Sequence, residues 1–155
     1  MLALFIIFIS VWLAYNTAIY FRYGLLTSVS ASHYALIGEN KNFGWIFTAC
    51  TWAYALPAMV IGQTGLMFFA GGFICFVGVA ANYKSGMDKI WHGRFAIFGV
   101  LLSQLSIFFD FGYWWINVGS VAAMIVLWIL NHKNKTYWVE QVAMLAIILT
   151  LITRL

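Results

Sequence analysis

Long apolar runs alternate with short polar segments along the whole chain, and this alternation is the strongest signal in the sequence. A helix needs about 20 mostly apolar residues to cross the hydrocarbon core of a bilayer. Segments of about that length can be drawn at 2–21, 43–62, 64–83, 92–110, 112–131 and 137–155. The sequence therefore predicts an all-α protein in which residues 1–155 form a single domain, a compact bundle of six transmembrane helices.

One face of the fourth segment carries only small and polar side chains, at alternating steps of four and three residues. This stripe consists of His92, Ala96, Gly99, Ser103, Ser106 and Asp110. Residues at these steps lie on one side of an α-helix. Because small residues mark helix–helix contacts in membranes, we predict that 92–110 is the central helix and that its stripe faces other protein.

Other segments carry similar stripes. They are Gly44, Thr48, Thr51, Ala55, Ala58 and Gly62 in the second, Gly71, Cys75, Gly78 and Asn82 in the third, and Glu140, Ala143, Ala146 or Ile147, Thr150 and Thr153 in the sixth. Because Glu140 belongs to such a stripe, we expect it to face inward. The short connection between the third and fourth segments predicts an antiparallel pair. In that pair Asn82 would lie at the level of His92, and Cys75 beside Gly99.

The basic residues are distributed unevenly between the two sides of the predicted bundle. Seven of the eight fall in or beside the first, third and fifth connections, and Arg154 alone falls on the other side. Lys and Arg are enriched in cytoplasmic loops. This bias predicts that both termini lie on the non-cytoplasmic side. The first connection, 22–42, is neither strongly apolar nor strongly charged, and we interpret it as an interfacial cytoplasmic segment.

Composition agrees with membrane insertion and excludes several classes of protein. The chain is 65% hydrophobic and only 8% charged, whereas soluble domains carry about 25% charged residues. We read the net charge of +4 as a topology signal and not as a sign of nucleic-acid binding. The expected location is the cell (inner or plasma) membrane, crossed several times, with membrane lipids, a partner membrane protein or a second copy as partners.

Few titratable side chains are available for chemistry. His33, Asp88, His92, His132 and Glu140 all fall near the predicted cytoplasmic face. Asp110 and Asn117 fall near the opposite face, and Asn82, Ser103 and Ser106 are further polar residues inside predicted spans. Asp110 follows His92 by eighteen residues, about 27 Å along a helix, so these two cannot form one catalytic pair. His92, Glu140 and Asp88 are the candidate catalytic residues.

Three functions from different classes fit this inventory. We prefer a non-enzymatic bundle that binds a lipid, a small amphiphile or a protein partner, with no cofactor, because no catalytic motif is present. A second is a metal-dependent lipid hydrolase at the cytoplasmic face, with His33, His92 and His132 as zinc ligands. The third is a small channel or proton-coupled transporter that uses His92 and Glu140 as relay groups.

Short motifs resemble one family. They are SVSASHY at 28–34, WIF at 45–47, Pro57, LMFFAGGFICFVGVAA at 66–81 and KIWHGRFA at 89–96. Together they resemble uncharacterised six-helix membrane proteins of bacteria and phages, and this resemblance implies a topology and no activity. A more distant likeness is to alkaline ceramidase and progestin-receptor-like membrane hydrolases, which use Ser, Asp and three His around zinc. The chain lacks their His-x-x-x-His pair and has one helix fewer.

Overall fold

The computed structural model describes the backbone of residues 1–81, 87–130 and 133–155, and the side chains of the same residues except 87–89. Within this part the chain is all-helical, as predicted. The α-helices are α1 (Leu2–Tyr23), α2 (Ala31–Glu39), α3 (Gly44–Gly62), α4 (Gly65–Ala81), α5 (Met87–Leu105), α6 (Trp114–Leu130) and α7 (Lys135–Ile152). A 3₁₀ turn, η1 (Lys41–Phe43), precedes α3, and a π-helical turn, η2 (Ser106–Asp110), continues α5.

In the described part of the chain, four helical stretches are long and apolar enough to cross a membrane, which indicates a membrane protein. They are Leu2–Tyr23, Lys41–Gly62, Ile90–Asp110 and Lys135–Ile152. The remaining apolar helices, α4 and α6, have 17 residues each. At 1.5 Å per residue each is about 25 Å long, at the lower end of what a span requires.

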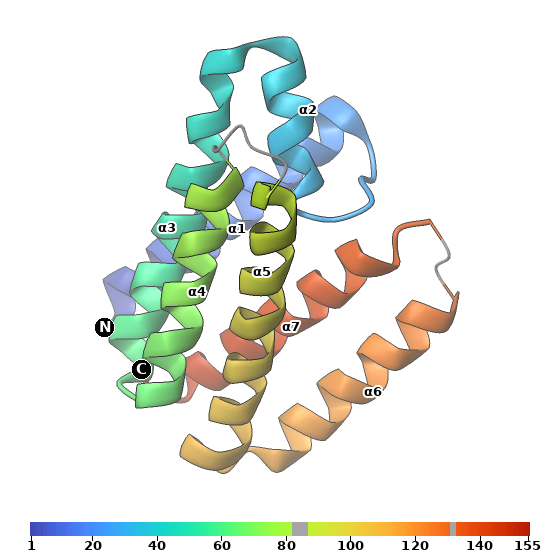
Figure 1. Ribbon diagram of the computed structural model, residues 1–155. Coiled ribbons are helices and arrows are strands. Elements are labelled where there is room, and N and C mark those ends of the chain that lie inside the picture. Colours follow the sequence, from blue (N-terminus) through green and yellow to red (C-terminus); the bar gives the residue numbers. More distant parts are fainter. Residues whose placement is uncertain (82–86, 131–132) are drawn as a thin grey trace.

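The helices form a bundle whose centre is the antiparallel set α3, α4 and α5 (Figure 1). α1 lies along the far side of α3 in this view, and α7 crosses the bundle at a steep angle. α6 leans away from the other helices and packs mainly on α7, so only Ile116 and Ser120 of α6 are buried. Such an exposed apolar helix is what lipid would surround.

The described part of the chain has three groups of buried apolar side chains, and the two larger ones hold the bundle together at different levels. One joins the first turns of α1 to the last turns of α7 through Phe5, Phe8, Ile148 and Leu151. The other surrounds Phe47 of α3 near the end of the bundle that carries α2. The first group brings the two ends of the chain to the same end of the bundle (Figure 1).

Glycines set the distance between α3 and α4. A Cβ added at Gly78 would lie 2.2 Å from Thr51 Oγ1 and 3.1 Å from the Cα of Thr48. One added at Gly71 would lie 3.2 Å from the carbonyl oxygen of Ala55. The small stripes of the second and third predicted segments therefore face each other, and Thr48 Oγ1 donates a hydrogen bond of 2.7 Å to the Gly78 carbonyl.

The α4–α5 pair is antiparallel, as predicted, but its contact differs in detail. A Cβ at Gly99 would lie 2.6 Å from Ile74 Cδ1 and 3.4 Å from the Ala70 carbonyl oxygen. Gly99 is thus opposite Ile74 and not Cys75, because the glycine stripe of α4 is turned toward α3. The predicted pairing of Asn82 with His92 lies outside the described residues.

The close α3–α4 contact predicts that alanine substitutions at two glycines of α4, Gly78 and Gly72, have different effects on stability. Gly78→Ala should destabilise the protein by about 1–3 kcal/mol, because the added methyl group meets the backbone of α3. Gly72→Ala is the matched control: the space beside Gly72 is open, and alanine is the better helix former. Thermal unfolding in detergent measures both, and equal stability of the two variants would contradict the packing described here.

Candidate functional site

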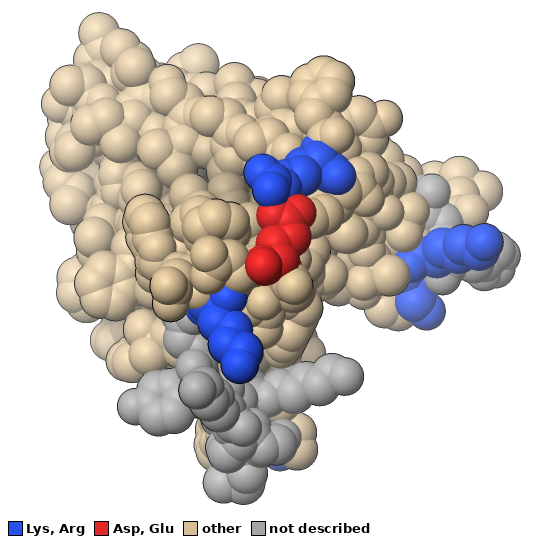
Figure 2. Space-filling view, turned by 90° about the horizontal axis from the view of Figure 1, so that it is seen from above, with Lys and Arg blue, Asp and Glu red and all other residues tan. Residues whose placement is uncertain are grey.

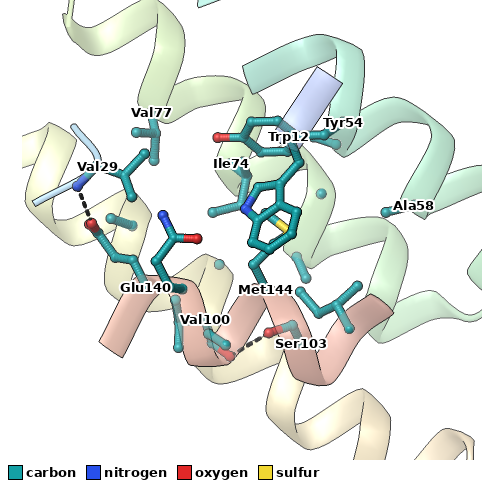
Figure 3. Close-up of a pocket in the computed structure, with 18 of the residues that line it drawn as sticks. Trp12, Val29, Tyr54, Ala58, Ile74, Val77, Val100, Ser103, Glu140 and Met144 are labelled. Atoms are coloured by element: carbon teal, nitrogen blue, oxygen red, sulfur yellow. Dashed lines mark hydrogen bonds between the residues drawn. The ribbon is translucent and has the colours of Figure 1, made fainter. Parts of the chain in front are cut away.

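A cavity of about 100 Å³ lies inside the bundle between α1, α3, α4, α5 and α7 (Figure 3). Most of its lining is apolar or aromatic and includes Trp12, Tyr54, Ile74, Val100 and Met144. An apolar protein cavity of about 150 Å³ is large enough for benzene. This space can therefore take several carbon atoms of a ligand.

The cavity exists because small residues line several of its walls. These are Ala55, Ala58, Ala70, Gly71, Ala96, Gly99 and Ala143. Most belong to the stripes predicted from the sequence, where they allow close helix contact. α7 crosses the other helices at a steep angle (Figure 1). The small side chains of several helices line the space that this packing leaves.

Among the described residues, Glu140 is the one acidic residue in the lining of this cavity. It lies five residues after Lys135, the first residue of α7, and its Oε2 accepts a hydrogen bond of 2.6 Å from the Val29 N–H (Figure 3). The Tyr137 N–H also donates to the Thr27 carbonyl at 3.1 Å. Both bonds tie α7 to the segment that connects α1 to α2. Glu140 therefore faces the interior of the bundle, as its place in the stripe of the sixth predicted segment indicates.

The two amide side chains of the lining are engaged with each other. Gln141 Nε2 donates to Asn16 Oδ1 at 2.7 Å, and Asn16 Nδ2 donates to the Trp12 carbonyl at 2.8 Å. Ser103, predicted as an intramembrane polar residue, also lines the cavity and donates to the Val100 carbonyl at 2.7 Å. These polar groups form hydrogen bonds within the protein. The polar character of the cavity therefore depends on the carboxyl group of Glu140.

A histidine cluster, defined here as His33, Phe47 and His92, adjoins the cavity through Phe47. The His33 and His92 rings lie 5.7 Å and 6.2 Å from the Phe47 ring. Both histidines are buried, and His92 Nδ1 lies 3.1 Å from the Val77 carbonyl oxygen. In the described part of the chain, His33 Nδ1 and His92 Nε2 are buried without a hydrogen-bond partner.

The structure brings some of the predicted metal ligands together and does not describe others. His33 and His92 share one cluster, whereas His132, Asn82 and the side chain of Asp88 lie outside the described residues. Among the described residues no group of three His, Cys, Asp or Glu could hold a metal ion. The zinc site therefore stays a prediction.

The remaining predicted polar residues lie at the joint between α5 and α6. Ser106 Oγ donates to Asp110 at 2.9 Å and lies 3.0 Å from Thr64 Oγ1, and Asn117 Nδ2 donates to the Gln104 carbonyl at 2.9 Å. These bonds brace the π-helical turn η2. They satisfy Ser106 and Asp110 locally, far along α5 from His92.

Sequence reasoning missed the aromatic and amide residues of the cavity. Trp12 and Asn16 stand in the first predicted segment, in which no small stripe was recognised, and Tyr54 stands one position before Ala55 of the second stripe. Gln141 directly follows Glu140. In the sequence, these residues merely stand next to stripe positions or polar neighbours. Such positions are too common in membrane helices to identify the residues of a cavity.

The end of the bundle that carries α2 exposes most of the described charged groups. Figure 2 looks onto this end and shows Lys and Arg side chains with acidic atoms beside one of them. Arg22 and Glu39 form an exposed ion pair there, and Glu39 lies in α2. The Arg22 guanidinium donates to both oxygens of Glu39 and lowers the pKa of that carboxyl.

Comparison with known proteins gives no relative to set beside this geometry. No family model, no curated protein and no solved structure matches the chain.

Burial lowers the pKa of His33 below its ordinary value, while the nearby carbonyl groups of Gly44 and Ala81 act in the opposite direction and the neighbouring His92 adds to the lowering. A histidine whose pKa is lowered by folding is held neutral in the native state, whereas the unfolded chain takes up a proton more readily. The native state should therefore lose stability as the pH falls through about 6.5, the ordinary histidine value.

The expected loss of stability at low pH gives a direct test of the histidine cluster. The unfolding temperature should fall between about pH 7.5 and pH 5, and the fall should be smaller in His33→Gln, which removes the titrating ring. Tyr34→Phe changes a neighbour on the same helix without removing a group that titrates in this interval, and it should keep the full pH dependence. An unchanged pH dependence in His33→Gln would contradict the buried, neutral state of His33.

Proposed function

We propose that the protein is a multi-pass protein of the cell membrane, with six spans, the basic connections in the cytoplasm and both termini outside. Four helices of sufficient length and apolarity support this, together with α4 and α6, which are apolar and only slightly shorter. The connection between α1 and α2 and the start of α7 lie at one end of the bundle, and the two chain ends lie at the other (Figure 1). That arrangement fits the bias in Lys and Arg positions.

Within this frame we propose a non-enzymatic function, the binding of part of a small amphiphile or of part of one lipid chain in the cavity. The observation that carries this proposal is the cavity itself, with its small and aromatic lining and Glu140 at one wall. Ligand sites of this kind are concave, mostly apolar and contain few polar groups. Membrane lipids are the nearest source of such ligands, and nothing in the chain favours nucleic acid.

Filling the cavity tests the proposal. Val100→Phe adds bulk to the lining and should weaken the binding of decanol, a neutral single-chain alcohol, by about tenfold or more, the equivalent of about 1.4 kcal/mol. Titration calorimetry of the protein in nanodiscs of zwitterionic lipid measures this binding.

The matched control stands on the same helix. Ile97 is 61% exposed on the outer face of α5, so Ile97→Phe adds a phenyl group where lipid accepts it. This variant should bind decanol like the wild type. Equal binding by both variants and the wild type would mean that the alcohol dissolves in the bilayer and does not occupy the cavity.

A second candidate is the metal-dependent lipid hydrolase. It is favoured by the two buried histidines with partnerless ring nitrogens and by Ser32, which follows Ala31 at the start of α2 and lies 2.5 Å from Tyr15 Oη. Zinc would need a third ligand, for which His132 is the predicted residue. Elemental analysis should find about one zinc per chain, lost in His92→Ala, if this candidate is correct; metal-free purified protein that still binds decanol would exclude it.

A further inference from the structure

The carboxyl group of Glu140 is placed where a charge is costly. It lines a cavity whose other side chains are almost all apolar or aromatic, inside a helix that is apolar enough to span a membrane. Ionised side chains at such positions are stable only when another group compensates their charge. The hydrogen bond from Val29 engages Oε2, and Oε1 accepts no hydrogen bond from any described residue.

The described basic residues do not supply the missing partner. Arg22 pairs with Glu39, and the cations of Arg94, Lys135 and Arg154 lie over the rings of Trp91, Trp128 and Phe111. The distance from Lys135 Nζ to the Trp128 ring is 4.2 Å, so even the cation nearest in sequence is directed toward α6. Within the described part of the chain, no Lys, Arg or His lies within 4 Å of Glu140.

The aromatic side chains of the cavity favour a cation as well. Phe8, Trp12, Phe47 and Tyr54 all contribute to the lining. The negative face of an aromatic ring attracts a cation, most strongly where water is excluded. Figure 3 shows Trp12 and Tyr54, like Glu140, among the residues that line the cavity. A carboxylate and aromatic rings around an apolar space are complementary to a positively charged group that carries a hydrocarbon chain.

We infer that the ligand of this cavity is a lipophilic cation, an amine or quaternary ammonium amphiphile, whose charged group pairs with Glu140 and whose nearest carbon atoms occupy the apolar space. This inference rests on the proposed binding function and specifies its ligand class. Binding needs no covalent step. The cation would approach the free Oε1 and leave the bond between Oε2 and Val29 in place.

A purely structural role is the competing explanation, since the bond to Val29 anchors the segment between α1 and α2. Glu140→Gln separates the two roles. Glutamine has nearly the same shape and keeps a carbonyl oxygen that accepts the Val29 N–H, but it carries no charge. The variant should therefore fold like the wild type, and its unfolding temperature and its binding of decanol report whether it does.

The experiment compares two probes of equal chain length in wild type, Glu140→Gln and Val100→Phe, each in zwitterionic nanodiscs. The probes are decyltrimethylammonium, a permanent cation, and decanol. By titration calorimetry, the wild type should bind the cation at least about tenfold more tightly than decanol. Glu140→Gln should lose that preference by at least about tenfold, measured as the ratio of its affinities for the cation and for decanol. Val100→Phe should weaken the binding of both probes.

The other outcomes are distinguishable. If wild type and Glu140→Gln bind both probes alike, and Val100→Phe weakens both, the cavity binds amphiphiles and the inference of a cation is overturned. If neither probe binds the wild type beyond empty nanodiscs, the proposed binding function itself fails. If Glu140→Gln loses decanol binding together with thermal stability, Glu140 acts as a structural anchor and the inference is again overturned.

Discussion

The close contact of α3 with α4 is the constraint on which the rest of the bundle depends. Lipid tails are as apolar as the helix surfaces, so burial of apolar area gives helices in a bilayer little reason to associate. Dispersion contacts and a few hydrogen bonds must hold the helices together instead, and both require backbones to approach closely. Gly71 and Gly78 allow that approach, and the bond from Thr48 to the Gly78 carbonyl adds a polar contact at the same place.

The cavity follows from the same small side chains. Where two helices run nearly antiparallel, as α4 and α5 do, small residues bring backbones together. α7 crosses the set at a steep angle, so its contact with the other helices is limited to part of its length (Figure 1). Ala143 of α7 lines the cavity together with small residues of α3, α4 and α5. Packing and binding therefore depend on one set of residues.

The sequence allowed more of the helix faces to be predicted than of the site. Spacing at four and three residues identified the stripes, and the stripes of α3 and α4 do face each other. Spacing could not show which neighbour each stripe meets, so Gly99 was assigned to Cys75 and not to Ile74. The π-helical turn at Ser106 also has no periodic signal, because it changes the hydrogen-bond register only locally, with the Phe111 N–H donating to the Ser106 carbonyl at 3.1 Å.

The site required information that no single helix carries. Glu140 was recognised as facing inward because it extends the stripe of its own helix. Trp12 and Tyr54 belong to helices far away in the sequence, and only the tilt of α7 brings Glu140 to the cavity that they line. The same carboxylate holds Val29 in the segment between α1 and α2, which also contributes to the lining. One carboxyl group therefore serves two purposes, because its Oε2 anchors that segment through the Val29 N–H while the residue also forms part of the cavity wall.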